Sequence, residues 1–511
     1  MSGRSKFTSG TRVQQLTRVA CAVLALGVCG CAVGPNFKRP AAPPVTHYST
    51  SADPTETVAA EGVVQRFTPG AQVTADWWRL FGSIGLDAVI AEALAKNPTV
   101  AAAEDSLRQS QDSLRSGYGI FYPQIAAEAD ATRQRFNALK IGDVVPASTI
   151  FNLFTLGASV SYALDVWGGE RRMIEGLRAQ VDLQRATEEA AYVSLAANIC
   201  NTVIARAAYR AEVDATSELI ALQREQVHIG EVQAEAGTVP YANVLLLRSQ
   251  LDAYEATIPQ LQVKLAQSED LLATLAGELP AGWHAPQIAL SELTLPADLP
   301  VSLPSDLVRQ RPDILVAEAA AHAASANVGV ATAAMLPSIT LSADYAANSV
   351  TTNQLFAANG RSWSVGADLT APLFQGGTLW YHRKAAIDSY QQAMHLYRQT
   401  VLNAFAQVAD TLQALAYDAA TLRAQKEALA SASEALHLVQ TTYAAGLSTY
   451  LEVLIADTQY HQAKINELQA VAVRYQDTVA LYVALGGGWW NANRDTAATI
   501  TQPPAEGSSI P

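Results

Sequence analysis

The feature that most constrains this chain is an internal repeat with a spacing of about 210 residues. Pro98 and Pro123 recur as Pro312 and Pro337, and both are shifted by 214 residues. Solenoid and propeller repeats have periods of roughly 20 to 50 residues, so a period of this length indicates a duplicated half-protein. Each half is therefore interpreted as one series of elements that occurs twice.

Each half contains one very long helix that ends at a glycine. Residues 170–236 contain no proline, and residues 378–445 are their counterpart. In the second stretch, apolar side chains recur at intervals of seven: Val401, Val408, Leu415, Leu422, Leu429, Leu436 and Tyr443. Such a seam predicts a left-handed supercoil of packed helices. Because glycine suits the left-handed position after a helix, Gly237 and Gly446 predict tight turns into a second helix, which Pro259 kinks in the first half.

Apolar and small residues alternate with polar ones in the segments that precede each long helix. The apolar positions are Ile125, Ala127, Ala129 and Ala131, then Leu156, Ala158, Val160, Tyr162 and Leu164, and in the second half Ile339, Leu341, Ala343 and Tyr345, then Trp363, Val365, Ala367, Leu369 and Ala371. Such alternation over about ten residues is typical of outer-membrane strands, although a soluble, half-buried sheet has the same pattern. We predict strand pairs at about 124–135 and 154–166 and at about 338–347 and 363–373.

Four strands cannot close a barrel within one chain. An open edge in lipid leaves backbone groups unpaired at a cost of several kcal/mol each, and the smallest single-chain barrels have about eight strands. Two chains would give an eight-stranded barrel, whose interior is largely filled by side chains. A conduit therefore favours three chains and twelve strands.

The N-terminus has the pattern of an export signal. Basic residues precede a short apolar core at Val19–Val28, which is too short to span a membrane as a helix. The sequence Val28-Cys29-Gly30-Cys31 resembles a lipobox, with residues 1–30 as signal peptide and Cys31 as the lipidated residue. An ordinary secretory signal that is cleaved nearby is the alternative. Ala32, in place of an aspartate, favours the outer membrane.

Composition excludes several classes of function. The formal charge of −13 argues against nucleic acid as a partner, because phosphate binding needs a basic surface. Beyond the signal, only Cys31 and Cys200 remain, so neither a disulfide framework nor a metal cluster is expected. No catalytic constellation is found, and the mature chain has no run of eighteen uncharged apolar residues that would predict a transmembrane helix.

The chain resembles the TolC/OprM-like outer-membrane factors, in particular their NodT-type lipoprotein branch. The resemblance rests on residues 34–40 (GPNFKRP) after Cys31, on Trp77-Trp78 with Phe81, and on residues 484–489 (ALGGGW). It implies a mainly α homotrimer whose four strands per chain form a twelve-stranded outer-membrane β-barrel, continued by a long periplasmic coiled-coil tunnel. It also implies a periplasmic adaptor (membrane-fusion) protein and an inner-membrane RND-type pump as partners. Apart from the lipid on Cys31, no cofactor is implied.

The same resemblance implies two sets of functional residues. The tips that dock the adaptor would be Ala236, Gly237 and Thr238 and, in the second half, Ala445, Gly446, Leu447 and Ser448. The periplasmic gate would be Leu451, Glu452, Ile455 and Asp457. Three copies of Glu452 near the axis would attract cations, whereas a solvated helix face is the alternative for this residue. The first half has Asn243 at the equivalent position.

These inferences predict six segments and one function. The segments are the signal peptide 1–30, a lipidated extended segment 31–75, a first repeat 76–277 with its hairpin at 170–277, a linker 278–303, a second repeat 304–488 with its hairpin at 378–486, and a flexible tail 489–511. The predicted function is a passive exit duct of a tripartite efflux system for drugs and other toxic small molecules, without enzymatic activity. A non-conducting periplasmic scaffold lipoprotein and a type I protein-secretion channel are the alternatives.

Overall fold

The computed structural model describes residues 32–49, 53–60, 62–137 and 148–491. The predicted signal peptide, Cys31 and residues 492–511 lie outside this part of the chain. The chain divides into two compact units, and the boundary between them falls inside four helices. Up to residue 39, and at 108–183 and 317–397, it forms the sheet unit; residues 40–107, 184–316 and those from 398 onward form the hairpin unit.

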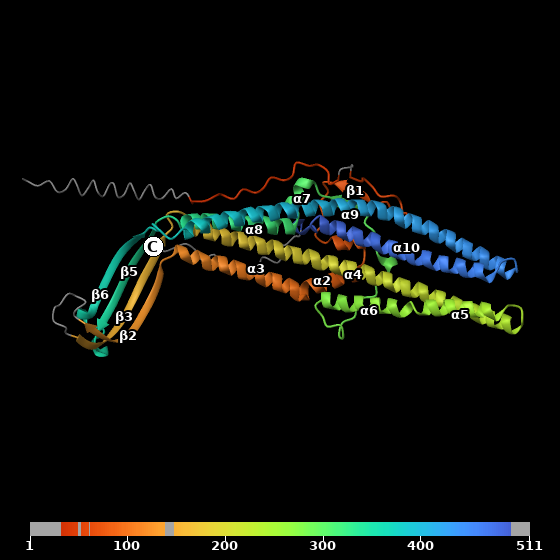
Figure 1. The fold of residues 1–511 in the computed structure, drawn as a ribbon, viewed down its shortest axis with the longest axis horizontal. Helices are drawn as coiled ribbons and strands as arrows, with labels where there is room; N and C mark the ends of the chain where they lie inside the picture. The colour runs from red at the N-terminus through yellow and green to blue at the C-terminus, as the bar shows by residue number, and fades with distance from the viewer. Residues whose placement is uncertain (1–31, 50–52, 61, 138–147, 492–511) are drawn as a thin grey trace, which may run out of the picture. The chain divides into compact units, whose positions relative to one another are not determined.

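The sheet unit is built on four antiparallel strands in the order β2-β3-β5-β6 (Figure 1). They are β2 (Gln124–Asn137), β3 (Ser148–Leu164), β5 (Ser338–Ser349) and β6 (Arg361–Thr370). Both predicted strand pairs are confirmed, although β3 begins earlier and β6 ends earlier than the sequence pattern indicates. Within the described residues, β2 and β6 each pair with one strand only, so both edges of this sheet are open.

The register brings the alternating residues into two continuous faces. One row across the apolar face is Ile125, Val160, Ala343 and Val365. The adjacent row on the polar face is Ala126, Ser159, Asp344 and Ser364, where the Ser364 hydroxyl donates to Asp344 at 3.3 Å. Apolar side chains on the first face are exposed, as the 76% exposure of Trp363 illustrates. One side of this sheet thus requires apolar surroundings and the other side tolerates water.

Each half contributes one helical hairpin, and most of both hairpins lies in the hairpin unit (Figure 1). The first consists of α4 (Gly169–Glu235), α5 (Tyr241–Glu255) and α6 (Ile258–Leu275), and the second of α9 (Thr378–Ala444) and α10 (Tyr450–Ala484). The kink predicted at Pro259 is a two-residue interruption between α5 and α6, where Ala256 and Thr257 keep right-handed helical angles, because proline has no N–H to continue the helical hydrogen bonds. The second half has no proline there, and α10 is continuous.

Both hairpins end in the same arrangement, a glycine after the last helix and a side-chain hydrogen bond to the end of that helix, which we call the latch. Gly277 and Gly486 follow the last helix of each half with positive φ angles of 80° and 93°. The Asn97 side chain donates to the Leu275 carbonyl at 2.8 Å, and in the second half Arg311 donates to the Ala484 carbonyl at 2.6 Å. Asn97 and Arg311 are 214 residues apart, which is the repeat spacing before the strands. Leu275 and Ala484 are 209 residues apart, which is the spacing after the strands. The duplication seen in the sequence is therefore also a duplication of contacts.

Shorter elements complete the fold. They are η1 (Trp77–Phe81), α2 (Ile84–Lys96), α3 (Pro98–Gly117), α7 (Pro304–Gln310), α8 (Pro312–Ala333), and the parallel strands β1 (Arg66–Pro69) and β4 (Asp298–Val301). The core of the hairpin unit contains Trp77, whose ring stacks on Tyr482 at 5.2 Å. Arg474, which is fully buried, donates to Gln65 and to the carbonyls of Ala60 and Val63, each at 3.2 Å.

Two of the predicted segment assignments are wrong in part. The linker 278–303 contains β4, which pairs with β1 from the segment predicted to be merely extended. The predicted flexible tail begins with a helical turn, η7 (Trp489–Asn491), in which the Trp489 indole donates to the Gln310 carbonyl at 2.8 Å. Residues 298–301 of the first segment and 489–491 of the second contact distant parts of the chain, and local sequence patterns do not reveal such contacts.

One described helix, α8, is long and apolar enough to cross a membrane by length and composition alone. α8 contains Asp313 and Glu318, so it is not a run of uncharged apolar residues. A packed core helix passes the same test, and α8 is packed: Ile314, Ala321 and Ser325 have no exposed surface. It also carries Glu318 and His322, which pair with Arg39 and Glu175.

Candidate functional site

The tips of the two hairpins have identical backbone turns. At the first tip the Gly237 N–H donates to Ala234 and the Thr238 N–H to Gln233, both at 3.0 Å. At the second tip Gly446 donates to Tyr443 and Leu447 to Thr442, both at 2.9 Å. This is the pair of bonds that closes a Schellman motif, which places glycine in the left-handed conformation. The φ angles of 72° and 75° at Gly237 and Gly446 agree.

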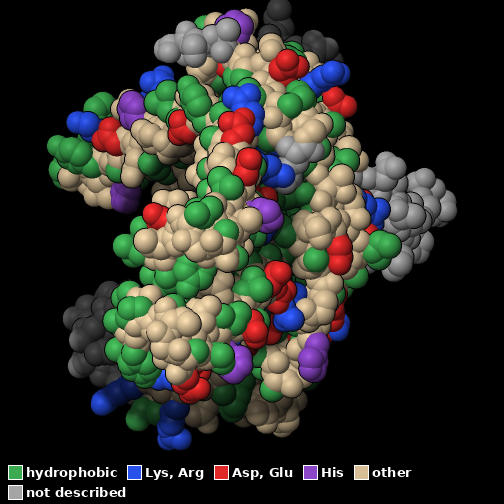
Figure 2. Space-filling view, turned by 90° about the vertical axis from the view of Figure 1, so that its right-hand side faces the viewer, with side chains coloured by type: hydrophobic (Ala, Val, Ile, Leu, Met, Phe, Trp, Pro, Cys, Tyr) green, Lys and Arg blue, Asp and Glu red, His purple; other side chains and the backbone are tan. Residues whose placement is uncertain are grey.

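All the predicted tip residues are exposed except Ser448, which is half-buried. Ser448 is fixed by hydrogen bonds with Thr442 at 3.1 Å and with the Val439 carbonyl at 3.3 Å. The two tips differ most at the residue after the glycine. Thr238 bonds back to the Gln233 carbonyl at 2.8 Å, whereas Leu447 is 80% exposed. At this position the second tip therefore presents an apolar side chain that the first one lacks. On the face that Figure 2 draws, hydrophobic, acidic and basic side chains are intermixed.

Three of the four predicted gate residues share one exposed face of α10. Leu451 and Ile455 are 57% and 49% exposed, and Glu452 is exposed beside them. The Glu452 carboxylate accepts a hydrogen bond from the Thr449 backbone N–H at 3.0 Å, which caps the start of α10. Glu452 is thus already bound in a structural contact at the position where the sequence predicts a charged ring.

Asp457, the fourth predicted gate residue, lies away from this face. Its side chain is buried and accepts a hydrogen bond from the Tyr254 hydroxyl on α5 at 3.3 Å. Burial raises the pKa of Asp457, although the Tyr254 hydrogen bond opposes this shift. Nearby, burial lowers the pKa of His461, whose ring lies 5.0 Å from that of Tyr254. Asp457 therefore joins the two hairpins.

A groove of about 660 Å³ lies between α4, α5, α9 and α10 next to the tips. Its walls include Leu247, Tyr443 and Tyr450 together with polar residues such as Gln226 and His437. Val227, Leu247, Tyr450 and Val453 form a small buried cluster beside it. The groove is a mixed apolar and polar surface that two hairpins create together.

Sequence reasoning missed a carboxylate pair in the second hairpin. Asp418 on α9 faces Asp477 on α10, and burial together with the hydrogen bond and negative charge of Asp418 raises the pKa of Asp477 to about 7. A shared proton would join these two helices. The available signal was an aspartate beside the buried positions Tyr475, Thr478 and Val479 of α10.

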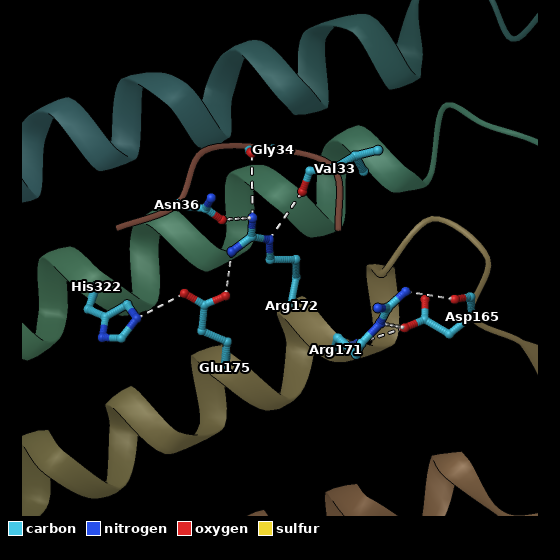
Figure 3. Close-up of polar contacts among 8 residues, drawn as sticks. All are labelled: Val33, Gly34, Asn36, Asp165, Arg171, Arg172, Glu175 and His322. Atoms are coloured by element: carbon cyan, nitrogen blue, oxygen red, sulfur yellow. Dashed lines mark hydrogen bonds and ion pairs between the residues drawn. The ribbon is translucent and has the colours of Figure 1, made fainter. Parts of the chain in front are cut away.

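In the sheet unit, the residues after Cys31 are held by one arginine on α4 (Figure 3). Arg172 donates to the Val33 carbonyl at 3.1 Å and to Asn36 Oδ1 at 2.6 Å. It also donates to the Gly34 carbonyl at 3.5 Å and forms an ion pair with Glu175 at 2.6 Å. We call residues 32–39 the strap. Arg172 is only 4% exposed, and its charge is paired with Glu175 on the same helix. Its hydrogen bonds to Val33, Gly34 and Asn36 fix the strap.

The strap is held from α8 as well. His322 bonds to Glu175 at 2.9 Å (Figure 3). The His322 ring also stacks on Phe37, with the centroids 4.5 Å apart. Burial opposes ionisation of Glu175, but the bonds from Arg172 and His322 prevail and lower its pKa. A Cβ added to Gly34 would lie 2.5 Å from Gly329 Cα, so the strap passes against the backbone of α8. The Cys31 prediction itself lies outside the described residues.

No group of side chains suited to a metal ion is found in the described ranges. They contain no group of three or more His, Cys, Asp or Glu side chains that could hold a metal ion. Cys200 is buried without a disulfide partner there, and burial raises the pKa of its thiol.

The family model described as outer membrane efflux protein matches this chain twice, at residues 89–278 and 303–487. The chain belongs to the outer membrane efflux protein family. The two matches coincide with the two halves and cover well over half of the chain. Members are outer-membrane channels of tripartite efflux systems and not enzymes, which confirms the predicted family, location and general function.

Individual proteins are similar to this chain over nearly its full length. The pyoverdine export outer membrane protein OpmQ of Pseudomonas aeruginosa is 28% identical, over 92% of this chain and 96% of its own. Nodulation protein T of Rhizobium leguminosarum is also 28% identical, over 96% of each chain. The solved outer-membrane channel OprN has the same fold, with a TM-score of 0.81 at 24% identity over 90% of this chain and 100% of that one.

Proposed function

We propose that three copies of this chain form a passive exit duct for small molecules at the end of a tripartite efflux system. The observation that carries the proposal is the four-stranded sheet with two open edges, one apolar face and one polar face. In hydrocarbon those edges must be paired, and three sheets give the twelve strands of a barrel wide enough to hold water.

The proposed partners are inferred from the tips of the two hairpins. A periplasmic adaptor would dock on Ala236, Gly237 and Thr238 and on the second tip, residues 445–448. The exposure of both tips and the groove beside them support this assignment. An inner-membrane RND-type pump would supply the energy, since the channel family itself is not enzymatic. A small-molecule cargo is supported by OpmQ, whose name states pyoverdine export.

The gate is proposed to lie on the exposed face of α10. Leu451 and Ile455 would narrow the mouth as apolar rings, because hydrophobic constrictions exclude water and ions. Glu452 would add negative charge beside them. Asp457, which is buried against Tyr254, is proposed to act indirectly by keeping α10 attached to α5.

Conductance of the purified protein in planar lipid bilayers tests the proposal. We expect low conductance from the native protein and a several-fold increase after Leu451→Ser with Ile455→Ser. Leu246→Ser is the matched control, since Leu246 is the equivalent of Ile455 in the first hairpin and is similarly exposed at 48%. Trimers that insert but never conduct in any gate variant would favour the scaffold alternative and overturn the duct.

A further inference from the structure

We propose that the apolar face of the sheet binds phosphorylated glycolipids of the outer leaflet through Arg133, Arg135 and Arg361. This inference rests on the duct proposed above, because it needs the apolar face of the sheet in contact with lipid. The class of ligand is inferred from the position, the surroundings and the charge of these three arginines.

The charged residues of the four strands are separated completely by face. In the register of the sheet, all three arginines alternate with apolar residues and lie on the apolar face. β3 has no charged residue. The four carboxylates of the strands lie on the polar face: Glu128, Asp130, Asp344 and Asp368. The sheet itself therefore offers its arginines no carboxylate on the face that they share.

The arginines also share one end of the sheet. β2 runs away from the helices and ends at Asn137, four residues after Arg133 and two after Arg135. β6 runs back toward the helices and begins with Arg361. Because the helical tunnel of this family is periplasmic, these positions lie at the end of the strands that faces out of the cell, which we call the outer end.

The height of the apolar band agrees with this placement. Ile125 and Leu369 are the apolar residues of β2 and β6 nearest the helices, and they lie eight residues from Arg133 and Arg361, respectively. Eight residues of a strand tilted by about 40° span roughly 20 Å in height, and the apolar band of such barrels is about 25 Å tall. The arginines thus lie at the outer border of the band, where charge on the lipid face is best tolerated.

Aromatic side chains mark the same border. Trp363 and Tyr345 pair directly opposite each other on the apolar face, and they are 76% and 49% exposed. Exposed Trp and Tyr rings on a lipid-facing surface lie at the level of the lipid headgroups. Arg361 lies two residues beyond Trp363 on the same face of β6. Its guanidinium is therefore placed among the headgroups of the outer leaflet.

Phosphate is the headgroup chemistry that fits these side chains. Arg133 and Arg361 are exposed, and neither forms an ion pair with a residue that the structure describes. Arg361 donates to the Phe356 carbonyl at 3.3 Å, a contact that carries no negative charge. A guanidinium binds phosphate through two parallel hydrogen bonds. Glycolipids with phosphates on their sugar headgroups belong to the outer leaflet, whereas phospholipids of the inner leaflet face the other end of the strands.

Binding of bisphosphorylated lipid A to the purified full-length lipoprotein in detergent tests the proposal. Native mass spectrometry counts the lipids bound to each trimer and gives their affinity. An arginine close to an anionic lipid surface raises affinity roughly fivefold. We therefore expect binding to weaken at least about tenfold in the triple variant Arg133→Gln, Arg135→Gln and Arg361→Gln. The control triple variant removes the same charge from exposed positions on the hairpins: Arg210→Gln, Arg224→Gln and Arg248→Gln.

Two further ligands identify what the surface recognises. We expect the native protein to bind bisphosphorylated lipid A several-fold more tightly than dephosphorylated lipid A or phosphatidylglycerol. Equal binding of dephosphorylated lipid A would overturn the phosphate contact. Equal binding of phosphatidylglycerol would overturn the assignment to the outer leaflet. Full affinity for lipid A in the triple variant would overturn the role of the arginines.

Trimer mass and conductance in bilayers, measured on every variant, separate this proposal from the duct. Native trimers that conduct but do not discriminate between the lipids would overturn the glycolipid surface and leave the duct intact. Native protein that forms no trimer, or trimers that never conduct, would overturn the duct. If the glutamine variant does not assemble, Arg133→Lys with Arg361→Lys keeps the charge and loses the paired hydrogen bonds. We expect several-fold weaker binding from it, and native affinity would overturn the proposal.

Discussion

The two hairpins begin their turns identically and then differ within a few residues. Both long helices end in a Schellman motif at a glycine, but the first continues through Pro240 without a side-chain cap, whereas Glu452 caps the second. Further along, the first hairpin is broken before Pro259 and the second is not. The halves therefore share the backbone turns that the repeat needs and differ in the side chains that control rigidity and charge.

In the proposed trimer, features that both halves share occur six times, whereas features of one half occur three times. Shared features, such as the latches at Leu275 and Ala484, determine how each half closes. Features of one half only occur three times in a trimer: Leu447 at the tip, Glu452 at the start of α10 and the carboxylate pair of Asp418 and Asp477. The predictions below test whether these differences matter.

The latches should differ in strength. Arg311→Ala removes hydrogen bonds to Ala484, Asp313 and Gln407, and charged hydrogen bonds contribute about 1.5–3 kcal/mol. We expect a loss of about 3 kcal/mol. Asn97→Ala removes one bond to Leu275 and the cap on Thr99, for a loss of about 2 kcal/mol. The unfolding temperatures of the two variants measure both losses of stability. Equal decreases in unfolding temperature would show that the two latches contribute equally.

The tip glycines should be equal in stability and unequal in function. Gly237→Val and Gly446→Val each force a β-branched side chain into the left-handed region, at a cost of about 1–2 kcal/mol. Because only the second tip presents an exposed Leu447, we expect Gly446→Val to reduce efflux in cells more strongly. Equal protein levels in the outer membrane are the control. If Gly237→Val reduced efflux more than Gly446→Val did, the first tip and not the second would be the more important one for docking.

Glu452 combines a cap with a charge, and two substitutions separate them. Glu452→Ala loses both, with about 1 kcal/mol of helix stability. Glu452→Gln keeps a side chain that can cap and removes only the charge. If the charged ring is real, both variants change the block of conductance by divalent cations. Should Glu452→Gln behave as the native protein does, the carboxylate acts as a cap alone.

The carboxylate pair should give the second hairpin its own pH dependence. The pKa of Asp477 is raised to about 7 in the fold, so the folded chain binds its proton more tightly than the unfolded chain. Its contribution to stability is complete below the unfolded pKa and is lost as pH rises toward 7. We expect Asp477→Asn to flatten the decline of the unfolding temperature between about pH 4 and 7. Ser268→Asn, at the equivalent position of the first hairpin, should leave the slope unchanged.

Local patterns in the sequence predicted most of the fold. The alternation around Ile125 and Val365 and the glycines at both tips act within a few residues, so they can be interpreted without a partner. In contrast, β1 and β4 have four residues each and exist because they pair across more than 200 residues. Arg172 and Arg474 are equally invisible in the sequence, because their partners come from the distant N-terminal segment.

The candidate site could be predicted only in part for a similar reason. Leu451 and Ile455 are four residues apart and share a helix face, which sequence spacing predicts correctly. Asp457 has the same spacing from the buried Val453, and this was the signal that its side chain points inward. Which face of α10 is buried, however, depends on Tyr254 of the other hairpin.

The strap has a consequence for the order of events during maturation. Its binding site combines Arg172 from the first half with His322 and Gly329 from the second, so the site does not exist until both halves have folded. In the folded chain, the same residues form a short connection between the proposed acyl-bearing residue and the base of the sheet. The strap contacts are therefore expected to form only after the two halves have come together.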